Sequence, residues 1–332
     1  MHDFSVLPGK DVVELLTGRE AEVIDWVREA YLAHDAGDTV NPDSYFLRFP
    51  EKPEARIIAL PAYLGGRDEV AGIKWIGSFP GNVDDGLPRA SAVLVLNDYR
   101  TGYPFALLES ANISAARTAA SAALAATTLG AKAPASVGVV GAGVIARTVC
   151  HYLTVAGVPF TDVTVHDLDD ASAAALAGHV GREYGADCRT GSLSQALGCD
   201  LVVLATTALR PYIGTDHVLR AGQVVLNVSL RDLEPELLLC AENFVDDVEH
   251  CLKAGTSPHL AEQRVGHRSF IRGTLADALL GRRTPDPERP VVFSPFGLGV
   301  LDLAVGHRLY RRAGEEGRLL PVPGFFGETS RW

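Results

Sequence analysis

The chain has 332 residues, of which 47% are hydrophobic and 21% are charged, a composition typical of a folded globular protein that excludes a mainly disordered chain. Asp and Glu (41) outnumber Lys and Arg (30), and the formal net charge of −11 argues against nucleic acid as the main partner, because that binding requires a basic surface. The five cysteines contain no Cys-x-x-Cys pair, which argues against a disulfide framework or a zinc knuckle.

The N-terminal segment and the most apolar stretch both argue against a membrane location. The first residues, Met-His-Asp-Phe-Ser-Val, lack the basic region and apolar run of a secretory signal. Residues 113–129 are rich in Ala, Ser and Thr and are interrupted by Arg117, so they predict a tightly packed helix rather than a membrane span. We therefore expect a cytoplasmic protein with no membrane partner.

The first part of the chain changes from a helical pattern to a strand pattern. Apolar residues recur with a helical period over 11–35, and the interruption at Thr17 and Gly18 predicts two helices joined by a short turn. Short β-rich runs follow, separated by Pro and Gly turns, and they predict a mostly antiparallel sheet. These runs cover 57–60, 71–79, 92–96 and 105–107. The Ala-rich helix comes next along the chain.

A domain boundary is predicted near residue 131, where a Gly- and Pro-containing segment (130–134) ends the Ala-rich helix. Beyond it, apolar strands alternate with helical segments, which is typical of a parallel sheet with crossover helices. The strands are expected at 137–140, 163–166, 201–205, 224–228 and 243–245. The second domain is therefore predicted to be α/β.

A glycine-rich turn follows the first of these strands, in the order Gly141-Ala-Gly143-Val-Ile-Ala146. Gly141 permits the tight turn, Gly143 lets the backbone approach a pyrophosphate, and Ala146 allows close packing of helix on strand. The next strand ends near Asp167, whose carboxylate is predicted to bind the adenosine ribose hydroxyls and to repel a 2′-phosphate. The pattern predicts NAD as the cofactor. The alternative is a simple strand-to-helix connector.

Two further strands end in polar residues. Thr206 and Thr207 follow the strand at 201–205, where hydroxyl groups can meet a cofactor, although ordinary capping explains them equally well. Asp232 follows the strand at 224–228 and is a candidate acid or base facing the nicotinamide. The alternative for Asp232 is a helix N-cap.

Three cations lie in apolar sequence surroundings: Arg48, Lys74 and Arg117. Buried cations are costly unless they are paired, so we expect them to bind substrate carboxylates or cofactor phosphates. The alternatives are an exposed strand face for Lys74 and structural ion pairs for the arginines. The acidic cluster at 246–251 is interpreted as a solvated strand-to-helix turn, and no metal site is predicted.

Several motifs together resemble the ornithine cyclodeaminase/mu-crystallin family over nearly the whole chain. They are Phe46-Leu-Arg48-Phe, Gly72-Ile-Lys74, Thr101-Gly-Tyr-Pro104, Arg117-Thr-Ala-Ala and Gly141-Ala-Gly143. Three others look like the subgroup of N-(2-amino-2-carboxyethyl)-L-glutamate dehydrogenases: Trp75-Ile-Gly-Ser-Phe-Pro-Gly-Asn82, Val228-Ser-Leu-Arg-Asp232 and Phe293-Ser-Pro-Phe-Gly-Leu-Gly299.

The resemblance implies a Rossmann NAD-binding domain at 131–305. It also implies an α+β substrate-binding and dimerisation domain at 1–130, which the C-terminal segment 306–332 joins. The implied protein is a homodimer. The implied activity is the oxidative hydrolysis of N-((2S)-2-amino-2-carboxyethyl)-L-glutamate with NAD. Its products are L-2,3-diaminopropionate, 2-oxoglutarate and NADH, and the first of these supplies siderophore or peptide natural-product biosynthesis.

The same resemblance assigns roles to individual residues. Asp232 is implied as the catalytic acid/base, Arg48 and Lys74 as ligands of the substrate carboxylate, with Lys74 also taking part in catalysis, and Arg117 as a ligand near substrate and cofactor. The residues implied around NAD, together with those of the glycine-rich turn, are Gly141, Gly143, Val144, Ile145, Asp167, Thr206, Thr207, Val228, Ser229, Ser91, Arg117 and Ser294.

One departure from the family pattern bears on the substrate. Cyclodeaminases typically carry Gly-Gly-Asp where this chain has Leu230-Arg-Asp232. The added cation would repel the side-chain amine of ornithine, whereas a tricarboxylate needs more cations, which Arg231 or Arg89 could supply. The alternatives are an ornithine cyclodeaminase, a related amino-acid dehydrogenase or ketimine reductase, and a nucleotide-dependent ligand-binding protein like mu-crystallin.

Overall fold

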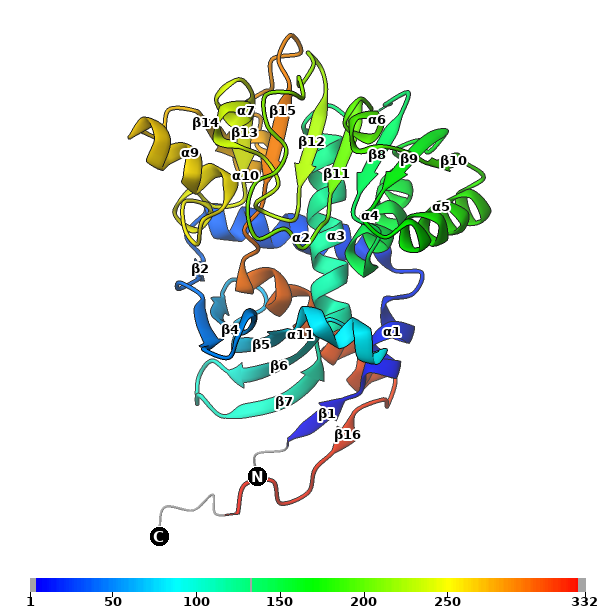
Figure 1. The fold of residues 1–332 in the computed structure, drawn as a ribbon. Helices are drawn as coiled ribbons and strands as arrows, with labels where there is room; N and C mark the ends of the chain where they lie inside the picture. The colour runs from blue at the N-terminus through cyan, green and yellow to red at the C-terminus, as the bar shows by residue number, and fades with distance from the viewer. Residues whose placement is uncertain (1–3, 132, 328–332) are drawn as a thin grey trace. The chain divides into compact units, whose positions relative to one another are not determined.

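The computed structural model describes residues 4–131 and 133–327 and divides the chain into two compact units. Unit 1 comprises Met1–Arg117 with Leu298–Trp332, and unit 2 comprises Thr118–Gly297. The chain passes from unit 1 to unit 2 within helix α3 (Ala111–Thr128) (Figure 1). The sequence places this boundary later, at 130/131, because a continuous helix shows no break in its pattern. The second boundary, expected at 305/306, also lies later than the observed one.

Unit 1 begins with the two helices that the interrupted period predicts, α1 (Gly9–Leu16) and α2 (Glu20–Asp35). Its described residues form an eight-stranded, mostly antiparallel sheet in the order β16-β1-β7-β6-β5-β4-β2, with β3 paired to β4. Sequence patterns missed the short edge strands. The strands are β1 (Ser5–Leu7), β2 (Thr39–Val40), β3 (Tyr45–Phe49), β4 (Lys52–Leu64), β5 (Val70–Ser78), β6 (Ala90–Asp98), β7 (Pro104–Glu109) and β16 (Leu320–Pro321), and a 3-10 helix η1 (Pro80–Asp85) follows β5.

The two faces of this sheet differ in their cover. Helix α11 (Gly299–Glu315) packs on one face, where Gly306 permits a close approach: an added Cβ would lie 2.2 Å from Leu94 Cδ2. Strand register places Lys74 opposite Leu94 on this covered face. The neighbouring residue Trp75 belongs to the other face, and it is 42% exposed.

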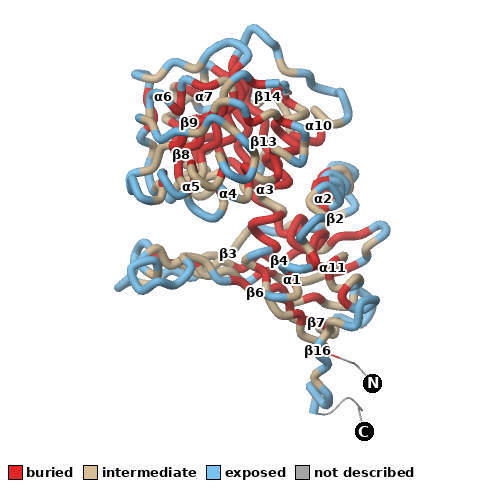
Figure 2. Tube along the Cα trace, turned by 90° about the vertical axis from the view of Figure 1, so that its right-hand side faces the viewer, coloured by how far each residue is buried: buried red, intermediate tan, exposed pale blue. Residues whose placement is uncertain are grey.

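Unit 2 is a doubly wound α/β unit, as predicted. Its described strands form an eight-stranded parallel sheet in the order β10-β9-β8-β11-β12-β15-β13-β14, and the order reverses beside β8. The central strands are buried throughout, which explains their continuous apolar sequences (Figure 2). The strands are β8 (Val137–Val140), β9 (Asp162–His166), β10 (Asp187–Thr190), β11 (Leu201–Leu204), β12 (Val224–Asn227), β13 (Glu242–Val245), β14 (Ile271–Thr274) and β15 (Val291–Ser294).

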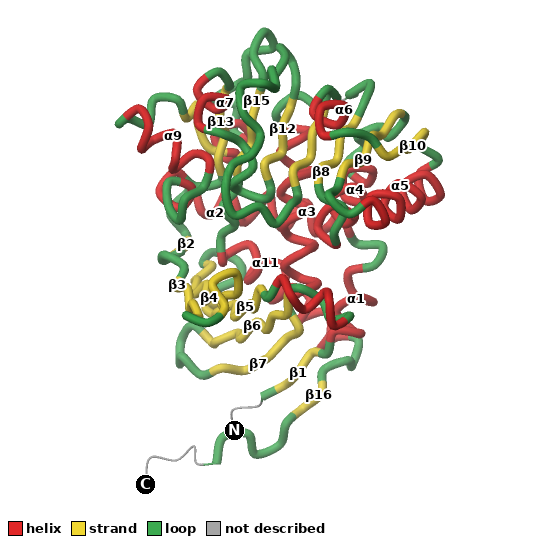
Figure 3. The backbone as a smooth tube through the Cα atoms, in the orientation of Figure 1, coloured by secondary structure: helices red, strands yellow, loops and turns green. Residues whose placement is uncertain are grey.

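Helices connect most of these parallel strands, and Figure 3 shows them alternating with strands along unit 2. They are α4 (Val144–Val155), α5 (Asp170–Tyr184), α6 (Leu193–Leu197), α7 (Pro235–Leu239), α8 (Val248–Cys251), α9 (Ser257–Val265) and α10 (Leu275–Leu279). Within 4–131 and 133–327, no helix combines the length and apolar character needed to span a bilayer.

Candidate active site

The glycine-rich turn joins β8 to α4, and its two glycines have different structural roles. Gly141 has a φ of +90°, and a Cβ there would lie 2.5 Å from the Ala205 carbonyl oxygen, so this position requires glycine. Gly143 is the N-cap of α4 and makes no side-chain cap. A Cβ at Gly143 would meet no atom within 4 Å. The start of α4 is therefore open to an approaching ligand.

Asp167 is fixed directly beside this turn. Its Oδ2 accepts a 2.6 Å hydrogen bond from the Ala142 N–H, and its Oδ1 accepts one of 2.9 Å from the Asp169 N–H. An open helix N-terminus for a pyrophosphate and a fixed carboxylate for ribose hydroxyls fit NAD. Gly141, Gly143, Val144 and Ile145 would border the pyrophosphate at this turn.

Asp232 lies in unit 2 in a shell of hydroxyl groups. The residue is fully buried, and its Oδ1 accepts hydrogen bonds from Thr206 Oγ1 at 2.5 Å and from Tyr212 Oη at 2.9 Å. Its Oδ2 accepts a further hydrogen bond from Ser229 Oγ. Thr206 and Ser229 follow β11 and β12, which are parallel neighbours, so both hydroxyls arise at the carboxyl edge of the sheet. These hydroxyl groups stabilise the buried carboxylate.

The geometry decides two of the alternatives. The N-cap of α7 is Glu234, so the interpretation of Asp232 as a helix cap is wrong. Thr206 Oγ1 accepts the Ala208 N–H at 3.1 Å while it donates to Asp232, so it serves both the turn and the carboxylate. Thr207 is exposed.

Sequence reasoning missed Tyr212, because its position after Thr206 follows no catalytic spacing. Burial, and then the negative charge of Asp232, raise the pKa of Tyr212 well above its ordinary value, so the phenol stays a donor. The loop is also strained: Leu230 has a φ of +77°, in the left-handed region that favours glycine.

Unit 1 contains a buried ion cluster of Lys74, Asp302 and Arg117. Lys74 Nζ lies 2.8 Å from Asp302 Oδ2 and donates to Ser114 Oγ at 3.0 Å, while Arg117 Nε lies 3.3 Å from Asp302 Oδ1. Lys74 is 2% exposed, so the alternative of an exposed strand face is wrong. Burial and the Arg117 charge lower the pKa of Lys74 to about 8, against the opposing effect of Asp302.

The partner of these cations, Asp302, was not identified from the sequence. The sequence does carry a signal for it, because Asp302 lies within an apolar helical run. A carboxylate that is buried in this way needs a cation as its partner. Arg117 thus forms a structural ion pair, which was the alternative to its binding of substrate or cofactor. Lys74 and Arg117 still present further N–H donors, so the pairing is compatible with an added substrate carboxylate.

Arg48 differs from the expectation of an apolar setting. It is exposed on β3, with its guanidinium 5.3 Å from the Phe46 ring centroid. The apolar neighbours in sequence mislead here because residues alternate between the two faces of a strand. The ladders β3–β4 and β4–β5 place Arg48 opposite Arg56 and Arg56 opposite Ser78, on the same sheet face as Lys74.

The other candidates of unit 1 lie near this end of the sheet. Arg89 donates to Ser78 Oγ at 2.8 Å, and burial lowers the pKa of Arg89. Ser91 is exposed on β6 opposite Gly77, which is on the face away from Lys74. The structure therefore brings Lys74 and Arg117 together. Arg48 lies on the cross-strand row of Arg56 and Ser78, and Arg89 contacts Ser78 through its hydrogen bond.

Three remaining candidates lie in unit 2. Arg231 Nη2 donates to the Ala254 carbonyl at 2.7 Å, and Arg231 borders an open depression of about 680 Å³. Ser294 is buried, and its Oγ accepts a hydrogen bond from Asn227 Nδ2 at 3.1 Å. Val228, directly after β12, is half-buried. Their roles toward NAD or substrate remain predictions.

The acidic cluster at 246–251 is a strand-to-helix turn, but the expectation that it is solvated is wrong, because Asp246, His250 and Cys251 are buried. The Asp246 carboxylate accepts the N–H groups of Phe296 and Gly297, and Asp247 caps α8 by accepting the His250 N–H. In the part of the chain that the structure describes, no group of His, Cys, Asp or Glu side chains is arranged to hold a metal ion.

Comparison with known proteins identifies the family of this chain. Residues 6–317 match the model of the ornithine cyclodeaminase/mu-crystallin family, and the chain belongs to that family. The N-((2S)-2-amino-2-carboxyethyl)-L-glutamate dehydrogenase of Staphylococcus aureus is 27% identical over 92% of this chain and 94% of its own length.

Two solved structures are similar over nearly their whole length. The Thermococcus litoralis Delta(1)-pyrroline-2-carboxylate reductase in complex with NADH and L-proline has a TM-score of 0.87 and 25% identity, covering 96% of this chain and 99% of its own. An archaeal alanine dehydrogenase dimer with bound NAD has a TM-score of 0.86 and 25% identity, covering 97% and 100%. The predicted fold class, oxidoreductase class and NAD cofactor are confirmed.

Replacing Asp302 by Asn tests the buried ion cluster. The variant leaves Lys74 and Arg117 as buried cations without their carboxylate, so we expect the free energy of unfolding to fall by about 3–5 kcal/mol. The control is Glu22→Gln, which breaks the more exposed ion pair between Glu22 of α2 and Arg312, a residue of the same helix α11 as Asp302. This variant should lower the free energy of unfolding by less than about 1 kcal/mol. Urea unfolding measures both, and equal losses would contradict the assignment.

Replacing Gly143 by Ala tests the nucleotide site. Its φ of −80° suits alanine and the added Cβ meets open space, so the melting temperature should stay unchanged. The Kd for NAD, measured by calorimetry, should rise about tenfold or more, because the Cβ occupies the pyrophosphate approach. Gly178→Ala on α5, where only the flexible Arg182 guanidinium is near, is the control for NAD affinity. Unchanged NAD binding in Gly143→Ala would refute the site.

Proposed function

We propose that this chain oxidises N-((2S)-2-amino-2-carboxyethyl)-L-glutamate with NAD and hydrolyses the resulting imine to L-2,3-diaminopropionate and 2-oxoglutarate. The observation that carries the proposal is the buried Asp232 carboxylate, held by hydroxyl donors at the carboxyl edge of the nucleotide-binding sheet. The similarity to the Staphylococcus aureus dehydrogenase supports this choice of substrate.

Asp232 is the proposed acid/base. Its carboxylate takes a proton from the secondary ammonium group of the substrate, because hydride leaves the glutamate Cα only with the help of a free nitrogen lone pair. NAD, when bound, supplies the hydride acceptor. Asp232 releases this proton to solvent after hydride transfer, and it then accepts a proton from the water that adds to the imine carbon. It returns that proton to the nitrogen of the resulting carbinolamine, whose C–N bond breaks as the carbinolamine hydroxyl proton passes to the departing amine.

The cations of unit 1 are the proposed carboxylate ligands. Arg48, Lys74 and Arg117 share the role that the family resemblance assigns, Arg by paired N–H donors and Lys as a point charge. The pKa of Lys74, lowered to about 8, leaves the ammonium protonated at neutral pH. Carboxylate binding through Lys74 should therefore weaken as the pH rises above 8.

Additional cations suit a substrate with three carboxylates. Arg231, next to Asp232, and Arg89, beside Ser78, are the proposed ligands for the extra groups. The same cation next to Asp232 disfavours ornithine, whose side-chain amine is positively charged. The diamino acid product would supply siderophore or peptide natural-product biosynthesis.

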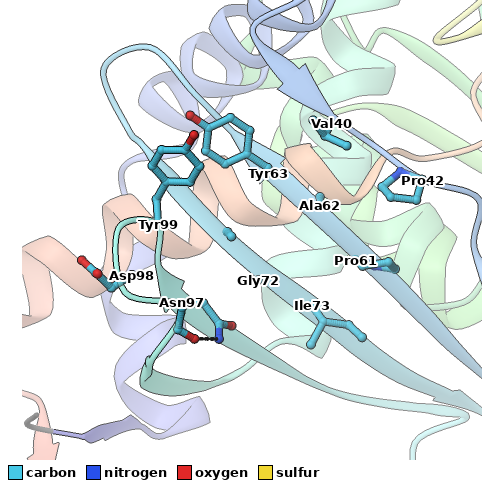
Figure 4. Close-up of a pocket in the computed structure, with 12 residues that line it drawn as sticks. Val40, Pro42, Pro61, Ala62, Tyr63, Gly72, Ile73, Asn97, Asp98 and Tyr99 are labelled. Carbon is cyan, nitrogen blue, oxygen red and sulfur yellow. Dashed lines mark hydrogen bonds between the residues drawn. The ribbon is translucent and has the colours of Figure 1, made fainter.

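We also propose that the chain acts as a homodimer through the open face of the unit 1 sheet. This face carries apolar side chains on adjacent strands, including Ile73 and Trp75. It also holds a hollow of about 450 Å³, which is lined by Pro61 and Ile73 and by the stacked rings of Tyr63 and Tyr99 (Figure 4). Exposed apolar patches of this kind typically mark interfaces. The similar archaeal alanine dehydrogenase is a dimer.

The substrate assignment is tested by NADH absorbance with the glutamate adduct, ornithine, glutamate and alanine supplied separately. We expect NADH only with the adduct, together with 2-oxoglutarate and diaminopropionate. Asp232→Asn should lower kcat at least about 100-fold while the Kd for NAD is retained. Asp216→Asn, at an exposed carboxylate of the same unit, is the control.

Proline and ammonia formed from ornithine, or NADH formed from alanine, would assign the chain to another activity of the family. Near-normal turnover by Asp232→Asn would remove Asp232 from the mechanism.

The dimer is tested by sedimentation equilibrium. The wild-type protein should have twice the chain mass of 35.3 kDa, and Ile73→Glu should sediment near 35.3 kDa because a charge would be buried in the interface. Val13→Glu, at an exposed apolar residue of α1, should remain dimeric. A monomeric wild-type protein, or a dimeric Ile73→Glu variant, would contradict the proposed interface.

A further inference from the structure

Tyr212 contacts the candidate base through both its side chain and its backbone. Its Oη donates to Asp232 Oδ1 at 2.9 Å, and its N–H donates to the Asp232 carbonyl oxygen at 3.1 Å. The neighbouring Ile213 N–H also donates to this carbonyl, at 3.0 Å. The backbone bonds hold the two loops together, so the phenol can be removed without removing the loop contact.

Tyr212 is also the most exposed of the hydroxyl donors to Asp232. Its residue is 43% exposed, whereas Thr206 and Ser229 are half-buried and Asp232 is fully buried. Thr206 is tied to its own turn through Ala208. The phenol of Tyr212 is therefore the donor whose removal should disturb the buried interior least.

The charged groups near this phenol favour a donor role. The negative charges of Asp232 and Asp167 act on Tyr212, and Arg231 directs its Nη2 to the Ala254 carbonyl. Burial and these carboxylates keep the Tyr212 phenol protonated. A protonated phenol at 2.9 Å from Oδ1 stabilises the ionised carboxylate more than the neutral acid.

We propose that Tyr212 is a positioning residue that keeps Asp232 ionised and fixes its orientation, so that Asp232 can act as a base. This inference rests on the proposed function, in which Asp232 accepts the substrate proton. Without the phenol, Oδ1 keeps only the Thr206 hydroxyl and Oδ2 keeps Ser229. The carboxylate then binds a proton more tightly, and the base is lost at a higher pH.

The test compares Tyr212→Phe with wild type and with Tyr184→Phe. The control removes a hydroxyl from the same unit, where Tyr184 Oη contacts His151 Nδ1 at 3.2 Å, outside the candidate site. Aspartate carboxyl carbons are labelled with carbon-13, and the resonance absent from Asp232→Asn identifies Asp232. Its titration midpoint should rise by about one pH unit in Tyr212→Phe and stay unchanged in Tyr184→Phe.

The pH profile of kcat/KM provides the second readout. Its acidic limb should move upward by the same amount in Tyr212→Phe, with similar rates above the limb and an unchanged Kd for NAD. An unchanged carboxyl titration in a folded Tyr212→Phe variant would overturn the inference. A wild-type protein without turnover of the adduct would refute the proposed function instead, because the titration tests Tyr212 without any substrate.

Discussion

The burial of one carboxylate shapes the candidate site. Asp232 is fully buried, and hydrogen bonds from the hydroxyl groups of Thr206, Tyr212 and Ser229 stabilise it. A parallel sheet makes this arrangement accessible, because the loops after β11 and β12 emerge at the same edge. The candidate residues for cofactor binding and for acid/base chemistry thus lie at one feature of unit 2, the carboxyl edge of its sheet.

Unit 1, by contrast, buries cations beside a carboxylate. Asp302 lies between Lys74 and Arg117, and its helix can approach the sheet because Gly306 leaves room for Leu94. The cluster contains two positively charged side chains and one negatively charged side chain. The excess positive charge suits a site for carboxylates. Burial, and then the charge of Arg117, explain why the pKa of Lys74 is low for a lysine.

The sequence predicts the parts of this account that depend on neighbouring residues. The turn at Gly141 and Gly143 and the α/β alternation are local patterns, and the structure shows both. The pairing of Lys74 with Asp302 joins residues 228 positions apart, and no local pattern encodes it. Tyr212 reaches Asp232 through hydrogen bonds between residues 20 positions apart, in two different loops, and no local pattern encodes them. The exposure of Arg48 depends on which strand face it occupies, which its apolar neighbours do not reveal.

In the proposed reaction, the chain oxidises the bond between nitrogen and the glutamate-derived Cα. Adduct that carries deuterium at this carbon, followed by mass spectrometry of the reduced cofactor and the products, shows which bond is oxidised. We expect deuterated NADH together with 2-oxoglutarate and diaminopropionate, because hydride leaves from the labelled carbon. Undeuterated NADH together with deuterated glutamate would show oxidation on the other side of the nitrogen and would refute the proposed reaction.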